Sequence, residues 1–249
     1  MTEIETRKLA DRDVLHAFPS GKGSTPLPCL VFYHGFTSSA LVYSYFAVAL
    51  AQAGFRVIMP DAPDHGARFT GDAPGRMGRF WQILLQNMQE FAGLRRAIEA
   101  ENWLSEGRLA VGGASMGGMT ALGIMARHQD VKCVASLMGS GYFTRLARTL
   151  FPPLEPDTPV RQAEFARIIA PLADWEVTHR LPQLAGRPLL LWHGEEDDVV
   201  PAVETSRLQQ ALGQAGLDQH LTCVWEAGVR HRITPEALAT TIGFFRQHL

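Results

Sequence analysis

Residues 109–117 read LAVGGASMG, an apolar run that passes into a glycine-rich turn. The run 109–111 predicts a strand buried on both faces, and a helix is predicted from about Met116. Ser115 then stands at a strand–turn–helix junction in the pattern G-x-S-x-G, where a tight turn exposes a nucleophilic hydroxyl. A phosphate-binding turn would need a following Lys or the spacing G-x-G-x-x-G, and neither is present. The stretch therefore predicts that Ser115 is a nucleophile in an α/β fold.

Strand-like and helix-like stretches alternate on both sides of this turn. Short, apolar runs predict buried strands at 30–33, 56–59, 131–138, 188–192 and 221–225. Apolar side chains recur at three and four residues between Phe80 and Ile98, which predicts an amphipathic helix. Thr234, followed by Pro and Glu, is typical of the start of another helix. This alternation predicts a mostly parallel, doubly wound sheet, whose ligands bind at the carboxyl ends of the strands.

One connection is too long for a plain crossover between parallel strands. Between Gly141 and Arg187 lie 47 residues, whereas such a crossover needs about a dozen. The stretch contains several prolines, and residues 160–169 after them have a helix-like pattern. It predicts a helical cap inserted at about 141–187. Because no repeat or linker divides the chain, residues 1–249 are expected to form a single domain.

A serine hydroxyl needs a base to take its proton, and the base needs an acid to orient it. In this topology the acid and the base follow on loops after later strands. The strand at 188–192 leads into an acidic loop that contains Asp197 and Asp198, and either carboxylate is short enough to orient an imidazole. His231 follows the last strand and precedes the helix that starts at Thr234. The residues thus predict His231 as the base and leave both aspartates open as the acid.

Eight other histidines compete with His231 for the role of base. His34 and His193 each precede a glycine at the end of a predicted strand, where a buried structural hydrogen bond is expected. His65 comes before the expected acid in the chain and lies on the wrong loop for a base. The remaining five lie outside the strand-end loops: His16, His128, His179, His220 and His248.

Composition excludes several classes of function. The 249 residues carry a net charge of −2, so no basic field is available for nucleic acid or an anionic membrane. No H-E-x-x-H or C-x-x-C spacing is present, and no metal or cofactor is expected. Residues 1–14 lack the apolar run of a secretory signal, and the apolar stretch 40–55 is too short to cross a bilayer. Three cysteines in strand-like runs, Cys29, Cys133 and Cys223, are expected to be buried and reduced, which predicts a cytoplasmic protein.

The residues quoted above resemble the α/β-hydrolase fold over essentially the whole chain. The resemblance is to the branch of small esterases near the dienelactone hydrolases and the prolyl-oligopeptidase-like enzymes. Residues 34–37, read HGFT, resemble the family's oxyanion loop. The resemblance implies that the backbone N–H of Phe36 is one oxyanion donor. Met116, which follows the nucleophile Ser115, supplies the other.

The same resemblance chooses between the two aspartates. Residues 193–201 are similar to the family's acid loop H-G-x-x-D-x-x-V-P, and this alignment selects Asp197 over Asp198. Residues 228–231 resemble the family's terminal G-x-x-H, which carries His231. Dienelactone hydrolases use a cysteine nucleophile, and Ser115 departs from them.

These features predict a serine carboxylesterase that hydrolyses small short-chain acyl esters through an acyl-enzyme. Apolar side chains of the cap are expected either to wall an acyl pocket or to pack the cap onto the sheet: Tyr142, Phe143, Leu146, Leu150, Phe151 and Trp175. The same triad serves peptidases, amidases and thioesterases, which remain alternatives. A ligand-binding protein that has lost the chemistry is a further alternative. The sequence makes no prediction of oligomeric state.

Overall fold

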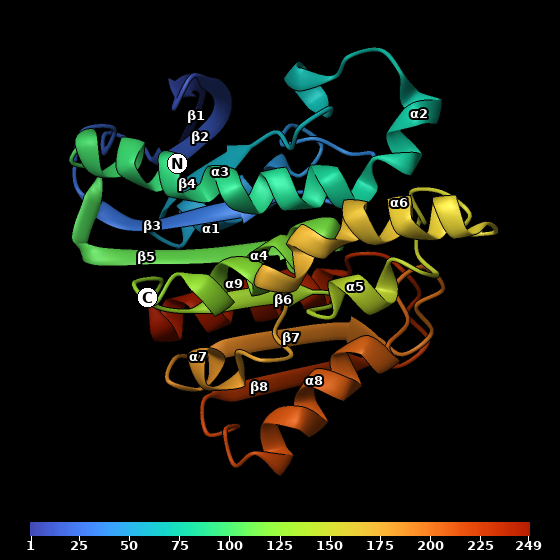
Figure 1. The fold of residues 1–249 in the computed structure, drawn as a ribbon. Helices are drawn as coiled ribbons and strands as arrows, with labels where there is room; N and C mark the ends of the chain where they lie inside the picture. The colour runs from blue at the N-terminus through green and yellow to red at the C-terminus, as the bar shows by residue number, and fades with distance from the viewer.

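The computed structural model describes residues 1–249 around one eight-stranded sheet (Figure 1), in the order β1-β2-β4-β3-β5-β6-β7-β8. Strands β3 to β8 pair in parallel, and β1 and β2 are antiparallel. The strands are β1 (Thr2–Leu9), β2 (Arg12–Pro19), β3 (Leu27–Tyr33), β4 (Arg56–Pro60), β5 (Leu104–Ala114), β6 (Val134–Leu137), β7 (Leu189–Gly194) and β8 (Leu221–Glu226). The predicted mostly parallel, doubly wound α/β sheet is confirmed.

Helices cover both faces of the sheet (Figure 1). They are α1 (Ser44–Gln52), α2 (Ala73–Gly78), α3 (Phe80–Ala100), α4 (Met116–Arg127), α5 (Phe143–Leu146), α6 (Pro159–Ile169), α7 (Leu181–Ala185), α8 (Val203–Gln214) and α9 (Pro235–His248), with short 3₁₀ helices η1 (Gly66–Arg68) and η2 (Ala170–Asp174). Helices α1 and α9 pack on one face, and α3, α4, α7 and α8 pack on the other. No helix is long and apolar enough to span a bilayer.

Burial on both faces explains why the central strands are continuously apolar. Every residue of β4 and of β7 is buried, and so are the last five residues of β3. The predicted helix between Phe80 and Ile98 corresponds to α3, whose buried residues follow the expected stripe. The predicted helix start at Thr234 is also confirmed, because the Thr234 hydroxyl accepts a hydrogen bond from the Ala237 N–H at 3.0 Å.

The hairpin of β1 and β2 has no counterpart among the strands predicted from the sequence. Six consecutive residues of β1 are exposed because the strand lies at the sheet edge, and they carry no apolar alternation. The turn between the strands consists of Ala10 and Asp11, which both have positive φ, 48° and 61°. A two-residue turn of this kind is usually signalled by Asn-Gly or Asp-Gly, and that signal is absent here. The strand predicted at 131–138 is also shorter, Val134–Leu137.

The strand order reverses at β3, which places the site. After β3 the chain adds β4 on one side, and β5 then starts the series on the other side. Ligands of doubly wound sheets bind at the carboxyl ends of the strands where this reversal occurs. Residue Tyr33 at the end of β3 lies beside Gly113 at the end of β5. The loop that starts at His34 and the turn at Ser115 therefore leave the sheet side by side.

Residues 141–187 contain α5, α6, η2 and α7 rather than a strand. Phe165 of α6 and Leu172 of η2 belong to the same apolar cluster as Phe80 and Trp81 of α3. This helical segment is thus attached to the main body through a shared buried core, as Figure 1 shows for α6 beside α3.

The three cysteines form no disulfide. Cys29 and Cys133 are buried as expected, whereas Cys223 is half-buried because it lies on the edge strand β8. Burial raises the pKa of the Cys29 and Cys133 thiols to about 12 and that of Cys223 to about 11. Since the thiolate is the reactive form, these cysteines are poor nucleophiles at neutral pH.

Candidate active site

Ser115 occupies a strained turn between β5 and α4. Its φ of 58° and ψ of −118° lie in a region that L-residues rarely adopt. The Ser115 N–H donates to the Leu137 carbonyl at 2.8 Å, which holds the turn against β6. A Cβ on Gly117 would lie 2.0 Å from the Tyr33 carbonyl oxygen, so only glycine permits α4 to start this close to β3. Strain that the surrounding structure enforces in this way is typical of functional sites.

Three side chains from distant loops form one hydrogen-bonded chain. The Oγ of Ser115 lies 2.8 Å from Nε2 of His231. The Nδ1 of His231 lies 2.7 Å from Oδ2 of Asp197. A carboxylate only accepts hydrogen bonds, so Nδ1 carries the imidazole proton and the Nε2 lone pair faces the serine hydroxyl. The structure thus brings together the predicted nucleophile, base and acid in the geometry that proton abstraction requires.

The surroundings of Asp197 keep its carboxylate ionised. Oδ1 accepts hydrogen bonds from the N–H groups of Val199 and Val200, both at 2.9 Å. Oδ2 lies 3.2 Å from Nε2 of His193 in addition to its bond with His231. Burial raises the pKa of this carboxyl, but hydrogen bonds from His193, His231 and the Val199 N–H outweigh burial and hold the pKa well below its usual value.

Asp198 has a different environment. Its side chain is 44% exposed, and it pairs with the guanidinium of Arg230. The Asp197 side chain, by contrast, has no exposed surface. The position of the His231 ring therefore favours Asp197, as the acid-loop resemblance implied.

Two backbone N–H groups beside Ser115 lack protein partners. Met116 is the first residue of α4, so its N–H has no acceptor within the helix. The Phe36 N–H, on the loop after β3, donates to no protein group. This loop approaches the nucleophile closely, since a Cβ on Gly35 would lie 3.6 Å from the Ser115 Cβ. Both predicted oxyanion donors thus lie in segments that meet at Ser115.

An aromatic cluster adjoins the same loop. The Phe36 ring lies 4.9 Å from the Phe80 ring and 5.4 Å from the Phe151 ring, measured between centroids. Phe80 and Phe151 are themselves 5.1 Å apart. Phe80 was predicted only as part of the apolar stripe of a helix. The only sequence feature that could have placed Phe80 near the site was its position at the start of the predicted helix, because helices of such folds start near the carboxyl edge of the sheet.

The other pocket residues predicted in the cap separate into two groups. Phe143, Leu146 and Leu150 are buried in the same apolar cluster as Met116. Trp175 belongs to this cluster as well, and the Arg127 guanidinium at the C-terminal end of α4 packs over its ring at 4.7 Å. Tyr142 packs beneath the Arg207 guanidinium of α8 at 5.2 Å. Tyr142 thus belongs to a different apolar cluster from the one that contains Met116.

The expected structural roles of His34 and His193 are confirmed. Both imidazoles are buried and hydrogen-bonded at each nitrogen. His34 Nδ1 donates to the Gly35 carbonyl at 2.8 Å, and Nε2 accepts from the Ala62 N–H at 3.0 Å. His193 Nδ1 pairs with the Thr205 hydroxyl at 2.7 Å.

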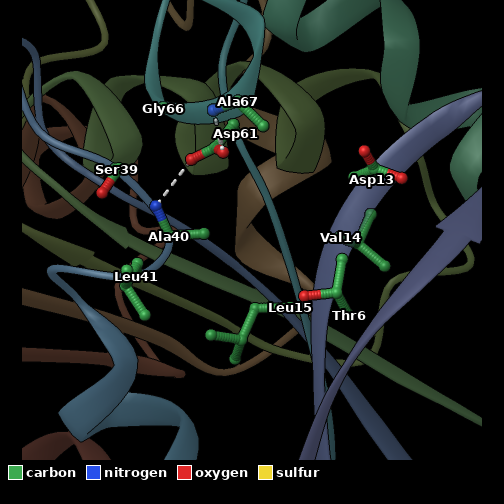
Figure 2. Close-up of a pocket in the computed structure, with 10 residues that line it drawn as sticks. All are labelled: Thr6, Asp13, Val14, Leu15, Ser39, Ala40, Leu41, Asp61, Gly66 and Ala67. Carbon is green, nitrogen blue, oxygen red and sulfur yellow. Dashed lines mark hydrogen bonds between the residues drawn. The ribbon is translucent and has the colours of Figure 1, made fainter.

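A cavity of about 280 Å³ lies next to the oxyanion loop, between β2 and the loops that follow β3 and β4 (Figure 2). It is lined by Thr6, Asp13, Val14, Leu15, Ser39, Ala40, Leu41, Asp61, Gly66 and Ala67. None of the predicted site residues lines it. As Figure 2 shows, Asp61 bridges the cavity wall, accepting hydrogen bonds from the Ala40 and Ala67 N–H groups at 2.7 and 2.9 Å.

Comparisons with known proteins identify relatives of this chain in sequence and in fold. A family model described as the prolyl oligopeptidase family matches residues 41–249. The chain is 70% identical to a protein of Escherichia coli (strain K12) named Esterase YjfP, over 249 residues and 100% of both chains. TT1662 from Thermus thermophilus has a similar structure, with a TM-score of 0.78 at 24% identity over 99% of this chain and 98% of that one. A puromycin-hydrolyzing peptidase of Mycobacterium tuberculosis shares the fold, with a TM-score of 0.72 at 19% identity. The match covers 100% of this chain and 39% of that one.

Proposed function

The chain belongs to the prolyl oligopeptidase family of α/β-hydrolases and is a serine esterase, and we propose that it hydrolyses short-chain acyl esters through Ser115, His231 and Asp197. The observation that carries this proposal is the unbroken chain of hydrogen bonds from Ser115 Oγ to His231 at 2.8 Å and from His231 to Asp197 at 2.7 Å. No cofactor takes part in the proposed reaction.

In the proposed mechanism, Nε2 of His231 takes the hydroxyl proton while Oγ of Ser115 attacks the ester carbonyl carbon. Asp197 stabilises the imidazolium that forms. The carbonyl oxygen becomes an oxyanion, which accepts hydrogen bonds from the Phe36 and Met116 N–H groups. His231 then gives its proton to the leaving alcohol, and an acyl-enzyme remains.

The second half of the reaction repeats these roles with water. His231 takes a proton from water, and the hydroxide attacks the acyl carbon. When the tetrahedral intermediate collapses, the carboxylic acid leaves and Ser115 recovers its proton from His231. Both halves need the neutral imidazole as base and the ionised Asp197 to orient it, which is consistent with the lowered pKa of that carboxyl.

We propose that the enzyme recognises its substrate by an uncharged acyl group. The aromatic rings of Phe36, Phe80 and Phe151 lie within 5.4 Å of one another beside the oxyanion loop. Phe143, Leu146 and Leu150 extend the same apolar cluster. A buried apolar wall favours an alkyl or aryl acyl chain over a charged one. We also propose a cytoplasmic location, which the three unpaired cysteines support.

Replacement of the nucleophile tests the proposal. Ser115→Ala should lower kcat on p-nitrophenyl butyrate by at least about 10³-fold and abolish labelling by a fluorophosphonate probe, because no other activated hydroxyl is present at the site. Ser206→Ala, on the outside of α8, is the matched control and should keep both properties. Labelling of Ser115→Ala at the native rate would contradict the proposal.

The same triad serves peptidases and thioesterases. The peptidase is the alternative that the family description, prolyl oligopeptidase, favours. Butyryl derivatives that differ only in the leaving group separate the three activities. We expect kcat/KM to be highest for the p-nitrophenyl ester relative to the thioester and the p-nitroanilide, after correction for the reactivity of each in water. A higher corrected rate on the anilide would favour a peptidase.

A further inference from the structure

His65 does not belong to the triad, yet it is completely buried against the loop that follows β3. Its Nε2 accepts a hydrogen bond from the Thr37 N–H at 3.0 Å. Its Nδ1 lies 2.8 Å from the Pro63 carbonyl oxygen. A carbonyl only accepts, so the proton must be on Nδ1 and the lone pair on Nε2. The two contacts therefore define a neutral imidazole in a single tautomer that bridges the loops after β4 and β3.

The partner of His65 lies in a strained turn. The Ser38 N–H donates to the Gly35 carbonyl at 3.3 Å, which closes a four-residue turn with Thr37 in its third position. Thr37 has a φ of 62°, a conformation that glycine adopts freely and a β-branched residue resists. A positive φ at the third position is typical of a type II turn. The commoner type I turn has negative φ there, and it differs by reversal of the central peptide group, here Phe36–Thr37. The His65 acceptor holds the Thr37 N–H and so opposes that reversal.

The preceding peptide group carries the proposed oxyanion donor. The Gly35 carbonyl accepts hydrogen bonds from His34 Nδ1 at 2.8 Å and from the Ser38 N–H. In a trans peptide the N–H points opposite to the carbonyl, so the Phe36 N–H is directed away from His34. If the Phe36–Thr37 peptide reversed, the turn would rearrange and the Phe36 N–H would lose this direction.

The loop that carries His65 is itself firmly anchored. Asp61 accepts hydrogen bonds from the Ala40 and Ala67 N–H groups on the two sides of the cavity (Figure 2). Gly66 precedes Ala67 and packs tightly against the same side chain: a Cβ on Gly66 would lie 2.2 Å from the Asp61 carboxyl group. Arg68 binds Glu90 of α3 through two hydrogen bonds, each of 2.8 Å. His65 thus projects from a rigid support onto the turn.

We propose that His65 is a positioning residue for ester hydrolysis, which holds the Phe36–Thr37 peptide so that the Phe36 N–H stays aimed at the oxyanion. This inference rests on the proposed esterase function. The role requires a free lone pair on Nε2. Burial lowers the pKa of His65 to about 4, so the imidazole stays neutral at neutral pH.

Two substitutions separate the acceptor from the rest of the side chain. In His65→Gln the amide oxygen can reach the position of Nε2 and accept from Thr37. In His65→Asn the amide lies near the position of Nδ1, so the link to Pro63 can persist while the acceptor for Thr37 is lost. We expect His65→Asn to lose about 10-fold or more in kcat on p-nitrophenyl butyrate, below the 10²–10³ that loss of a whole donor costs, with KM changed less than about 3-fold. His65→Gln should recover most of this loss.

A transition-state analogue gives a readout that general loosening would not move. A trifluoromethyl ketone with the same acyl chain forms a tetrahedral adduct with the serine, whose oxyanion uses the same donors. Its inhibition constant should rise in His65→Asn by the factor by which kcat/KM falls. Rates are normalised to active sites titrated with the fluorophosphonate. His16→Asn removes a buried histidine of β2 whose partners are Glu5 and Arg56 rather than the turn, and it should leave both constants unchanged.

A second background keeps the inference testable if His65→Asn folds poorly. In Thr37→Gly, glycine adopts the positive φ freely and does not need the hydrogen bond to His65. The loss of kcat caused by His65→Asn should therefore be smaller in that background. Equal kcat and inhibition constants for the native protein, His65→Asn and His65→Gln would overturn the inference while leaving the esterase function intact. A native protein that neither hydrolyses esters nor reacts with the fluorophosphonate would overturn both.

Discussion

Asp197 and Asp198 are neighbours in sequence with opposite surroundings. Asp197 receives hydrogen bonds from two backbone N–H groups and from His231, and its side chain has no exposed surface. Asp198 faces solvent and the Arg230 guanidinium. Since orientation of an imidazole needs a carboxylate held in one position, only Asp197 is placed to act on His231.

Conversion of each aspartate to asparagine tests this distinction. Asp197→Asn should lower kcat on p-nitrophenyl butyrate by about 10³–10⁴-fold, because an amide can stabilise the wrong tautomer of His231 and cannot stabilise its charged form. Asp198→Asn should stay within about 3-fold of native, because its charge is screened by solvent. Steady-state kinetics on both variants provide the measurement. Equal losses would show that the acid had been assigned wrongly.

At the scale of residues, the sequence predicted the candidate triad better than it predicted the contacts that support the surrounding loops. G-x-S-x-G predicts Ser115 because the strain and the glycines belong to one short turn. The choice of Asp197 came from the resemblance, since the two carboxylates are equivalent as residue types. His65 was assigned no part in the site, because its bond to Thr37 joins loops that lie 28 residues apart.

At the scale of elements, helix α4 sits unusually close to the sheet. A Cβ on Gly117 would lie 2.0 Å from the Tyr33 carbonyl oxygen of β3, and one on Gly118 would lie 2.8 Å from the Leu137 carbonyl oxygen of β6. Small residues at the start of α4 therefore allow its N-terminus to reach the carboxyl ends of β3 and β5. This approach directs the positive end of the helix at the position of the oxyanion.

Paired alanine substitutions in two helices test the close approach. Gly117→Ala should lower the free energy of unfolding by about 1–3 kcal/mol or more, because backbone atoms of β3 cannot yield to the added methyl group. Gly243→Ala in α9 meets nothing within 4 Å and should raise it by about 0.5–1 kcal/mol through helix propensity. Urea unfolding measures both. A Gly117→Ala protein as stable as native would mean that α4 can move away from the sheet at little cost.

Elements with a strong apolar pattern were predictable, and the others were not. β3, β4 and β7 are buried on both faces and appear as continuous apolar runs. The edge strand β1 has mostly charged, exposed side chains. Its backbone pairs with β2, and Glu5 also lies 3.0 Å from the His16 imidazole of β2. Such a strand carries almost no side-chain signal, which is why the hairpin was missed.

At the scale of the whole molecule, buried imidazoles link stability to pH. Burial lowers the pKa of His16 and His65 to about 4 from the ordinary value of 6.5, and it also lowers the pKa values of His34 and His128. Between pH 6.5 and 4 the unfolded chain binds protons at these groups while the folded protein resists them. Unfolding then takes up protons, and stability decreases as the pH falls.

The free energy of unfolding should accordingly decrease between pH 7.5 and pH 5. His65 alone contributes about 1–2 kcal/mol of that decrease, given its pKa of about 4. His65→Gln lacks this titration. Between pH 7.5 and pH 5 its free energy of unfolding should therefore decrease by about 1–2 kcal/mol less than that of the native protein, whatever its value at pH 7.5. Urea unfolding at both pH values measures the difference. Identical pH dependence in the variant and the native protein would contradict a buried neutral His65.

We propose that residues 1–249 form one cooperative unit in which residues 141–187 are an inserted cap. The apolar cluster that contains Phe80, Trp81 and Met116 of the main body also contains Phe165 and Leu172 of the insertion. Removal of the insertion would expose this cluster, so the cap and the body are expected to unfold together.

By itself, the sequence determined the elements with strong periodicity and the parallel sheet, and it predicted Ser115 as the nucleophile. Each of these depends on residues that are close together in the chain, where spacing reports burial and backbone conformation directly. Only the tertiary structure decided which cap residues pack in the apolar cluster of Met116, how Asp197 differs from Asp198, and how His65 contacts the turn at Thr37. Those features depend on distances between loops that are far apart in sequence, and the packing of helices against the sheet sets these distances.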